Sequence, residues 1–245
     1  MNELLLLNEC KVRENGKRKR AVKIMFQGYT NETFEFFMAI RFNNNRDFFH
    51  ANYEWYQRAV RQPSLDLAQD LNAVIEEIDP DLERRPYRCL SRINRDIRFS
   101  NDKSPYRDYL WISFKHPGPD ADRLPAFYYD MSDEGASVGM GFYRDNPECI
   151  RALRRRMEQR PETVLRLLEA IGDFDLDLTT GRRVDIPETV PAGLRPWYAA
   201  KNFYFTQEIK DFDRIKSPAL ADTLRDGFKR LAPVYRLILN PDGTD

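Results

Sequence analysis

The residues best suited to hold a charged partner lie in one window of the chain, from Glu83 to Asp108. The window contains eight basic side chains (positions 84, 85, 88, 92, 95, 98, 103 and 107) against four carboxylates (83, 96, 102 and 108). Arginine binds phosphate or carboxylate through paired hydrogen bonds, and lysine adds a point charge. The positive excess favours an anion site. The alternative is an internal ion-pair network that only shapes the loop, and counting charges does not separate the two.

The candidate ligand-binding residues are polar side chains of this window joined by polar residues from two other segments: Arg92, Arg95, Asp96, Arg98, Asp102, Lys103, Tyr106, Asn43, Asn44, Asn45, Arg46 and Tyr128. Asp96 or Asp102 would serve as a general base if chemistry follows binding, but nothing selects a reaction type. A magnesium-dependent hydrolase built on the same two residues is a further alternative, although carboxylates in an arginine-rich loop are usually ion-paired. The sequence therefore assigns no catalytic residue.

The local structure of the window decides which side chains share a face. In a strand, the period of two places Arg92, Asn94, Asp96 and Arg98 on one face. Ile93, Ile97 and Phe99 then face the core, with Arg95 among them. In a helix, Arg88, Arg92 and Arg95 would stack instead. The alternation of apolar residues favours the strand.

Composition predicts a soluble globular protein. The 245 residues are 42% hydrophobic and 13% aromatic, which is enough for a core, and no stretch approaches the ~18 apolar residues of a membrane span. The 39 basic residues balance 39 acidic ones, so no overall basic field exists for nucleic acid or an anionic membrane.

The cysteines and histidines predict neither a metal site nor a cofactor. Cys10, Cys89 and Cys149 are far apart, with no CxxC pair, which favours three reduced thiols in the cytoplasm. His50 and His116 are the two histidines of the chain, so no His-rich metal site is available, and no nucleophile motif accompanies either.

Residues 1–24 differ in charge from the rest of the chain. They carry seven basic residues and three acidic ones, which leaves 32 basic and 36 acidic residues elsewhere and a net charge of −4. A nucleic-acid or targeting arm, a disordered tail and an extended start before a natural Met25 are the alternatives. Short basic runs are common, so the tail or the mis-assigned start is favoured.

From residue 25 to 245 the patterning predicts a single α+β domain, with N-terminal helices followed by a mostly antiparallel sheet and further helices packed on it. Helices are expected near 30–42, 46–60, 63–78, 147–160 and 161–171, with a last helix from Ser217 that ends or kinks at Pro233. Strands are expected near 110–114, 126–131, 137–143, 174–178 and 201–206. Gly139 and Gly141 are expected to mark a β-bulge, or else a close approach of a ligand or another chain.

The motif from Arg95 to Tyr106, RDIRFSNDKSPY, resembles the signature of the DUF2461 family, which is widespread and mainly bacterial. Phe26-Gln-Gly28 and the segment from Asn43 to Phe49 resemble the opening of that family; Tyr128-Tyr129, the Gly139/Gly141 strand and Lys201-x-Phe203 fit more loosely. The resemblance spans about Met25 to the C-terminus. The family implies no activity, cofactor or partner.

Three functions compete. The first is a pocket for a small anionic ligand, bearing phosphate or carboxylate, with or without a reaction. The second is a non-catalytic protein-interaction module in which the Arg/Asp motif is structural. The third is nucleic-acid binding through residues 11–23 and the arginine-rich helix after Pro147, against which the acidic remainder of the chain argues. The oligomeric state is not predicted.

Overall fold

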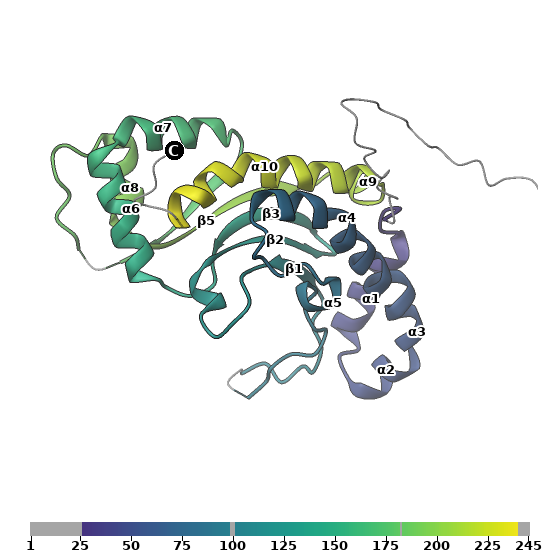
Figure 1. Cartoon of the computed structure of the whole chain (residues 1–245). Coiled ribbons are helices and arrows are strands. Elements are labelled where there is room, and N and C mark those ends of the chain that lie inside the picture. Colours follow the sequence, from purple (N-terminus) through teal and green to yellow (C-terminus); the bar gives the residue numbers. More distant parts are fainter. Residues whose placement is uncertain (1–25, 99–100, 182, 240–245) are drawn as a thin grey trace, which may run out of the picture.

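The computed structural model describes residues 26–98, 101–181 and 183–239 (Figure 1). The predictions for residues 1–24 lie outside this part. The predicted fold class is confirmed, because the described residues form one compact domain of N-terminal helices, an antiparallel sheet and further helices. None of the helices in these ranges is long and apolar enough to cross a membrane.

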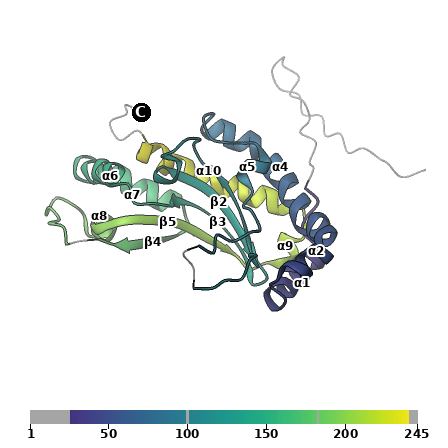
Figure 2. The same cartoon turned by 90° about the horizontal axis from the view of Figure 1, so that it is seen from below.

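The N-terminal helices follow the aromatic periodicity of the sequence. They are α1 (Asn31–Phe42), α2 (Arg46–Ala51), α3 (Tyr53–Tyr56), the π-helical turn η1 (Gln57–Arg61) and α4 (Gln62–Ile78). Thr30 and Thr33 form a capping box at the start of α1, and the side chain of Asn45 caps α2 by accepting from the Phe48 N–H. Figure 2 shows α1 and α2 at one end of the sheet, with α6 (Pro147–Gln159) and α7 (Pro161–Ala170) at the other.

The sheet consists of five antiparallel strands in the order β1-β2-β3-β5-β4. They are β1 (Leu110–Phe114), β2 (Pro125–Ser132), β3 (Gly135–Phe142), β4 (Asp175–Thr180) and β5 (Ala200–Ile209). In β1 and β2 buried and partly exposed residues alternate, which is the pattern of a sheet with one face on the core.

Of the remaining helices, α5 (Pro86–Cys89) precedes the first strand, and the others lie between strands or after the last one. These others are α6 (Pro147–Gln159), α7 (Pro161–Ala170), α8 (Arg195–Ala199), α9 (Phe212–Ile215), α10 (Ala219–Leu239) and the 3-10 turns η2 (Ala121–Arg123) and η3 (Ala192–Leu194). Of the two outcomes expected at Pro233, an end or a kink, the end is wrong, because α10 continues to Leu239. Its buried face, which includes Val234, Tyr235 and Ile238, continues past the proline and holds the last turn on the sheet.

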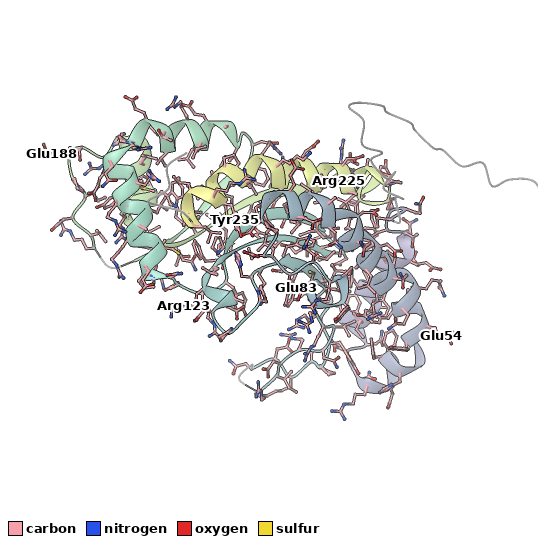
Figure 3. The ribbon with its side chains drawn as sticks, viewed as in Figure 1. Glu54, Glu83, Arg123, Glu188, Arg225 and Tyr235 are labelled. Atoms are coloured by element: carbon pink, nitrogen blue, oxygen red, sulfur yellow. The ribbon has the colours of Figure 1, made fainter. Side chains whose placement is uncertain are left out.

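The core lies between the sheet and α10, which runs along the upper side of the sheet in Figure 1. Phe228 of α10 packs edge-to-face on Phe127 of β2 at 5.3 Å between ring centroids, and on Phe114 of β1 at 6.0 Å. Tyr235, labelled in Figure 3, adds a contact with Phe127 at 4.9 Å. Aromatic burial of this size contributes much of the stability of a domain.

The expected bulge at Gly139 and Gly141 is wrong. The pairing of β3 with β2 and with β5 runs without a register shift, whereas the irregularity of the sheet lies between Thr179 and Thr180. A Cβ at Gly139 would meet the Tyr128 ring at 2.5 Å, and a Cβ at Gly141 would meet the Tyr204 ring at 2.5 Å. The two glycines therefore make room for the Tyr128 and Tyr204 rings, which pack edge-to-face on the outer face of the sheet.

Candidate functional site

The arginine-rich motif forms an arm, which we define as residues 90–98 and 101–109. Leu90 bridges to Ile112 of β1, and Asn94 bridges to Tyr106, both in antiparallel fashion. Two backbone hydrogen bonds flank the second bridge, from Arg95 N to the Pro105 carbonyl (2.9 Å) and from Arg107 N to the Ile93 carbonyl (2.8 Å). The arm is thus an irregular hairpin that projects below the sheet in Figure 1.

The predicted faces of the arm are confirmed for residues 92–98, whereas Phe99 lies outside the described residues and the continuous strand is wrong. Arg92, Asn94, Asp96 and Arg98 are exposed, and Ile93, Arg95 and Ile97 alternate with them as partly buried residues. Aspartate side chains take backbone N–H groups that a ladder would use: Asp96 accepts from Arg98 N (3.2 Å) and Asp102 from Ser104 N (2.9 Å). These local hydrogen bonds compete with strand pairing and turn the chain.

Both aspartates of the motif are paired with arginine. Arg98 donates two hydrogen bonds to Asp96, from Nε at 2.9 Å and from a terminal nitrogen at 2.7 Å, and this lowers the pKa of Asp96 to about 2. Arg95 donates to Asp102, whose pKa is lowered mainly by the Ser104 N–H. Carboxylates whose pKa is lowered are weak bases near pH 7, so the arrangement disfavours either residue as a general base.

Three cations of the arm form no ion pair with a carboxylate among the described residues: Arg92, Lys103 and Arg107. Lys103 Nζ donates to the Ile97 carbonyl at 3.0 Å. Arg107 donates to the carbonyls of Asn94 (2.6 Å) and Arg92, and its charge adds a small lowering effect on the pKa of Asp96. Arg92 has an exposed side chain with no recorded partner in this part of the chain. The arm therefore keeps positive charge that its own carboxylates do not neutralise.

Of the three consecutive asparagines at positions 43–45, Asn44 contacts the arm. Asn44 accepts from Tyr106 N (3.0 Å) and donates to the Tyr106 carbonyl (2.9 Å), so one side chain satisfies both backbone groups of a buried residue. The Tyr106 ring stacks on Phe49 of α2 at 4.2 Å. Asn43 bonds only within its own helix, to the Ala39 carbonyl, and Asn45 caps α2. Arg46 is exposed at the start of α2.

Tyr128 belongs to a different group of side chains. It lies on the outer face of β2, where its hydroxyl hydrogen-bonds to the Thr206 hydroxyl at 2.6 Å and its ring covers Gly139. Burial raises the pKa of Tyr128 to about 12. No recorded contact joins it to the arm in the described part of the chain.

Sequence reasoning missed an arginine that holds the arm in place. Arg41 of α1 donates from Nε to Asp108 at 2.6 Å and from both terminal nitrogens to Asp133, at 2.9 and 2.5 Å. Asp108 is next to the last residue of the arm, and Asp133 lies in the turn between β2 and β3. No short-range signal links these residues, because they are 67 and 92 positions apart from Arg41.

An aromatic stack beside the arm was also missed. Tyr109 stacks on Trp111 at 5.9 Å between ring centroids and 26° between ring planes, and the Arg107 guanidinium lies 4.7 Å from the Trp111 ring. The signal was present in the sequence, because residues i, i+2 and i+4 of an extended segment share one face.

A small recess lies at the base of the arm. It is lined by residues of α1, α3, η1, α4, the arm and the start of β1: Phe37, Tyr56, Val60, Arg61, Ser64, Leu90, Ser91, Ile93, Tyr109 and Leu110. It has room for about one water molecule. An anionic ligand of the arm would therefore lie on its exposed surface rather than inside this recess.

The arginines that precede the arm are organised by Glu83, which Figure 3 labels. Arg85 donates to this carboxylate at 2.8 and 2.5 Å, and Arg88 donates at 3.4 Å. The pKa of Glu83 falls from 4.5 to about 2, mainly because of the Arg85 side chain. Arg84 pairs instead with Glu76 of α4. These arginines are thus less available to a ligand than Arg92.

We expect Glu83→Gln to lower the free energy of unfolding by roughly 1–3 kcal/mol at pH 7, because it removes charge-assisted hydrogen bonds. Because the pKa of Glu83 is lower in the folded state, its carboxylate stabilises the fold at pH values above the unfolded pKa of about 4.5. That contribution is lost as the pH falls toward the folded pKa of about 2. Urea denaturation of parent and variant at pH 7 and at pH 2.5 measures the difference. A gap between the two proteins that does not narrow at pH 2.5 would contradict the ion-pair explanation.

Among the described residues, no cluster of three or more His, Cys, Asp or Glu side chains is placed to hold a metal ion. No curated protein matches the chain. A family described as "Conserved hypothetical protein (DUF2461)" matches residues 32–236, a span that contains the whole arm, Asn44 and Arg41. Because this match covers most of the 245 residues, the chain belongs to the DUF2461 family.

Proposed function

We propose that the protein binds a small anionic ligand, bearing a phosphate or carboxylate group, on the exposed surface of the arm. One observation carries the proposal: Asp96, Asp102 and Asp108 are each paired with an arginine, whereas Arg92, Lys103 and Arg107 form no ion pair within the described residues. Guanidinium and ammonium groups that lack a carboxylate partner are free to bind one from a ligand.

The anchoring of the arm supports this proposal. Asn44 clamps the backbone of Tyr106, and Arg41 ties Asp108 to the turn at Asp133. A surface held in place before the ligand arrives loses less conformational freedom on binding, which favours affinity. The proposal does not include a reaction.

A cytoplasmic location is part of the proposal. The sequence has three widely spaced cysteines and no CxxC pair. Cys89 is buried, and burial raises the pKa of its thiol to about 12, so it is a poor nucleophile and behaves as a packing residue. This usage fits a reducing compartment.

A protein-interaction module is the second candidate. The observation that favours it is that Asp96 and Asp102 each hold an arginine and a backbone N–H of the arm, so much of the motif acts to fix the shape of the loop. In this case the arm would present a rigid surface to another protein. Replacing Arg92, Lys103 or Arg107 would then not change the melting temperature measured in the presence of small anions.

A thermal-shift series separates the two candidates. Pyrophosphate, citrate and nucleotides are added to the parent, to Arg92→Gln, to Lys103→Gln and to the control Lys210→Gln, which removes an exposed lysine paired with Glu208. A ligand at 100 times its Kd stabilises by about 2.7 kcal/mol, or roughly 5–10 °C for a domain of this size. We expect this rise in the parent and the control, and a smaller one in the arm variants. If no anion raises the melting temperature of the parent, anion binding is wrong and the interaction module is favoured.

A further inference from the structure

An aromatic surface adjoins the cations of the arm. Arg107 connects the two, because its guanidinium lies 4.7 Å from the Trp111 ring while it donates to the carbonyl of Arg92. Tyr109 extends the surface by stacking on Trp111, and the relative solvent exposure of Tyr109 is 42%. A flat π surface and unpaired positive charge therefore lie next to each other at the start of β1.

This combination fits a particular class of anion. Nucleobases stack on aromatic side chains and on arginine guanidinium planes, and their phosphates bind arginine and lysine. A simple phosphate or carboxylate would use only the cations and would leave the Tyr109–Trp111 surface without a role. A ligand that carries both a base and a phosphate uses both parts.

The charges beyond Trp111 limit the length of such a ligand. On the outer face of the sheet, the row that continues from Trp111 passes through its cross-strand neighbours Asp130, Ser137 and Glu208. Two of these three residues are acidic, and the next row ends at Asp175 of β4. A long polyanion that followed the sheet away from the arm would meet these carboxylates, which disfavours a nucleic-acid strand.

We propose that the ligand of the arm is a mononucleotide, whose base stacks on Tyr109 beside Trp111 and Arg107 and whose phosphate contacts the unpaired cations, Arg92 first among them. This inference rests on the proposed function, since it names the ligand class of the same arm. It assigns Tyr109 and Trp111 as a base subsite.

Calorimetric titration of the full chain compares AMP, ribose 5-phosphate and adenosine, in the parent and in three variants. Tyr109→Ala removes the exposed ring, Tyr109→Phe restores it without the hydroxyl, and Tyr143→Ala is the matched control at a highly exposed tyrosine after β3. AMP and ribose 5-phosphate carry the same phosphate charge, so the ratio of their affinities isolates the base. We expect AMP to bind about tenfold more tightly than ribose 5-phosphate in the parent, in Tyr109→Phe and in Tyr143→Ala.

In Tyr109→Ala the AMP preference is expected to disappear, with the affinity for ribose 5-phosphate unchanged. Equal binding of AMP and ribose 5-phosphate by the parent, both weakened by Arg92→Gln, would overturn the base subsite and leave the proposed function standing. Failure of both phosphates to bind would overturn the two together. A ten-nucleotide single strand that binds far more tightly than AMP, with strong salt dependence, would also overturn the mononucleotide assignment and point to nucleic acid.

Discussion

Replacing Gly139 with alanine is expected to lower the free energy of unfolding by about 3 kcal/mol or more, because the added methyl group has no space. Its Cβ would overlap the backbone carbonyl of Phe205 in β5 and would lie 2.5 Å from the Cζ and the hydroxyl oxygen of Tyr128. The Phe205 carbonyl belongs to a central strand whose ladder continues on both sides, so it cannot move away without breaking the pairing of β3 with β5.

Urea denaturation followed by circular dichroism measures this loss. Gly193→Ala is the matched control, because the nearest atom to its Cβ would be the end of the Leu165 side chain at 3.4 Å, and we expect a change of less than about 1 kcal/mol there. A Gly139→Ala variant as stable as the parent would contradict the conclusion that the Tyr128 side chain and the Phe205 carbonyl leave no space for a methyl group here.

Asn44→Ala is expected to cost about 2–3 kcal/mol of stability and to weaken anion binding. The substitution leaves the N–H and the carbonyl of Tyr106 without the side chain that satisfies both, and an unsatisfied buried group costs roughly 1–3 kcal/mol. The bridge of Leu90 to Ile112, the Arg41 ion pair and the packing of Tyr106 on Phe49 would still hold the arm, but its backbone at Tyr106 would no longer be fixed. A less ordered arm binds a ligand less tightly.

The neighbouring asparagine provides the control for this prediction. Asn43→Ala removes a hydrogen bond within α1 only, to the Ala39 carbonyl, so we expect it to be nearly neutral in both measurements. Chemical denaturation gives the stability, and titration with pyrophosphate gives the affinity. If the two variants cannot be told apart, Asn44 does not anchor the arm.

The helices and the sheet could be predicted because their signals are local. The face of α4 that buries Leu67, Leu71 and Val74 repeats at the helical period, and β2 alternates along its whole length. The exposed and partly buried faces of the arm followed from the same rule. Membership of the family followed from the motif at 95–106 and is confirmed by the match over residues 32–236.

Several of the failures share one physical cause, which is contact between residues that are distant in sequence. The sequence alone does not distinguish a bulge at Gly139 from close packing, because the residues that flank this glycine, Tyr128 and Phe205, come from other strands. The pairing of Arg41 with Asp133, and that of Asn44 with Tyr106, depends on how α1 and α2 pack against the sheet. Pro233 was expected to end or kink α10, and it does not end it, because burial of the residues that follow outweighs the lost hydrogen bond.

The most direct test of anion binding by the arm is a titration of the isotopically labelled protein with pyrophosphate, followed by amide chemical shifts. Binding at the arm predicts saturable shifts at residues 90–98 and 101–109 and in the Asn44 region, with α6, α7 and β4 unchanged. Arg92→Gln should reduce these shifts together. Saturable shifts confined to the arginine-rich α6, or no saturable shift at all, would contradict the proposal that the arm is an anion site.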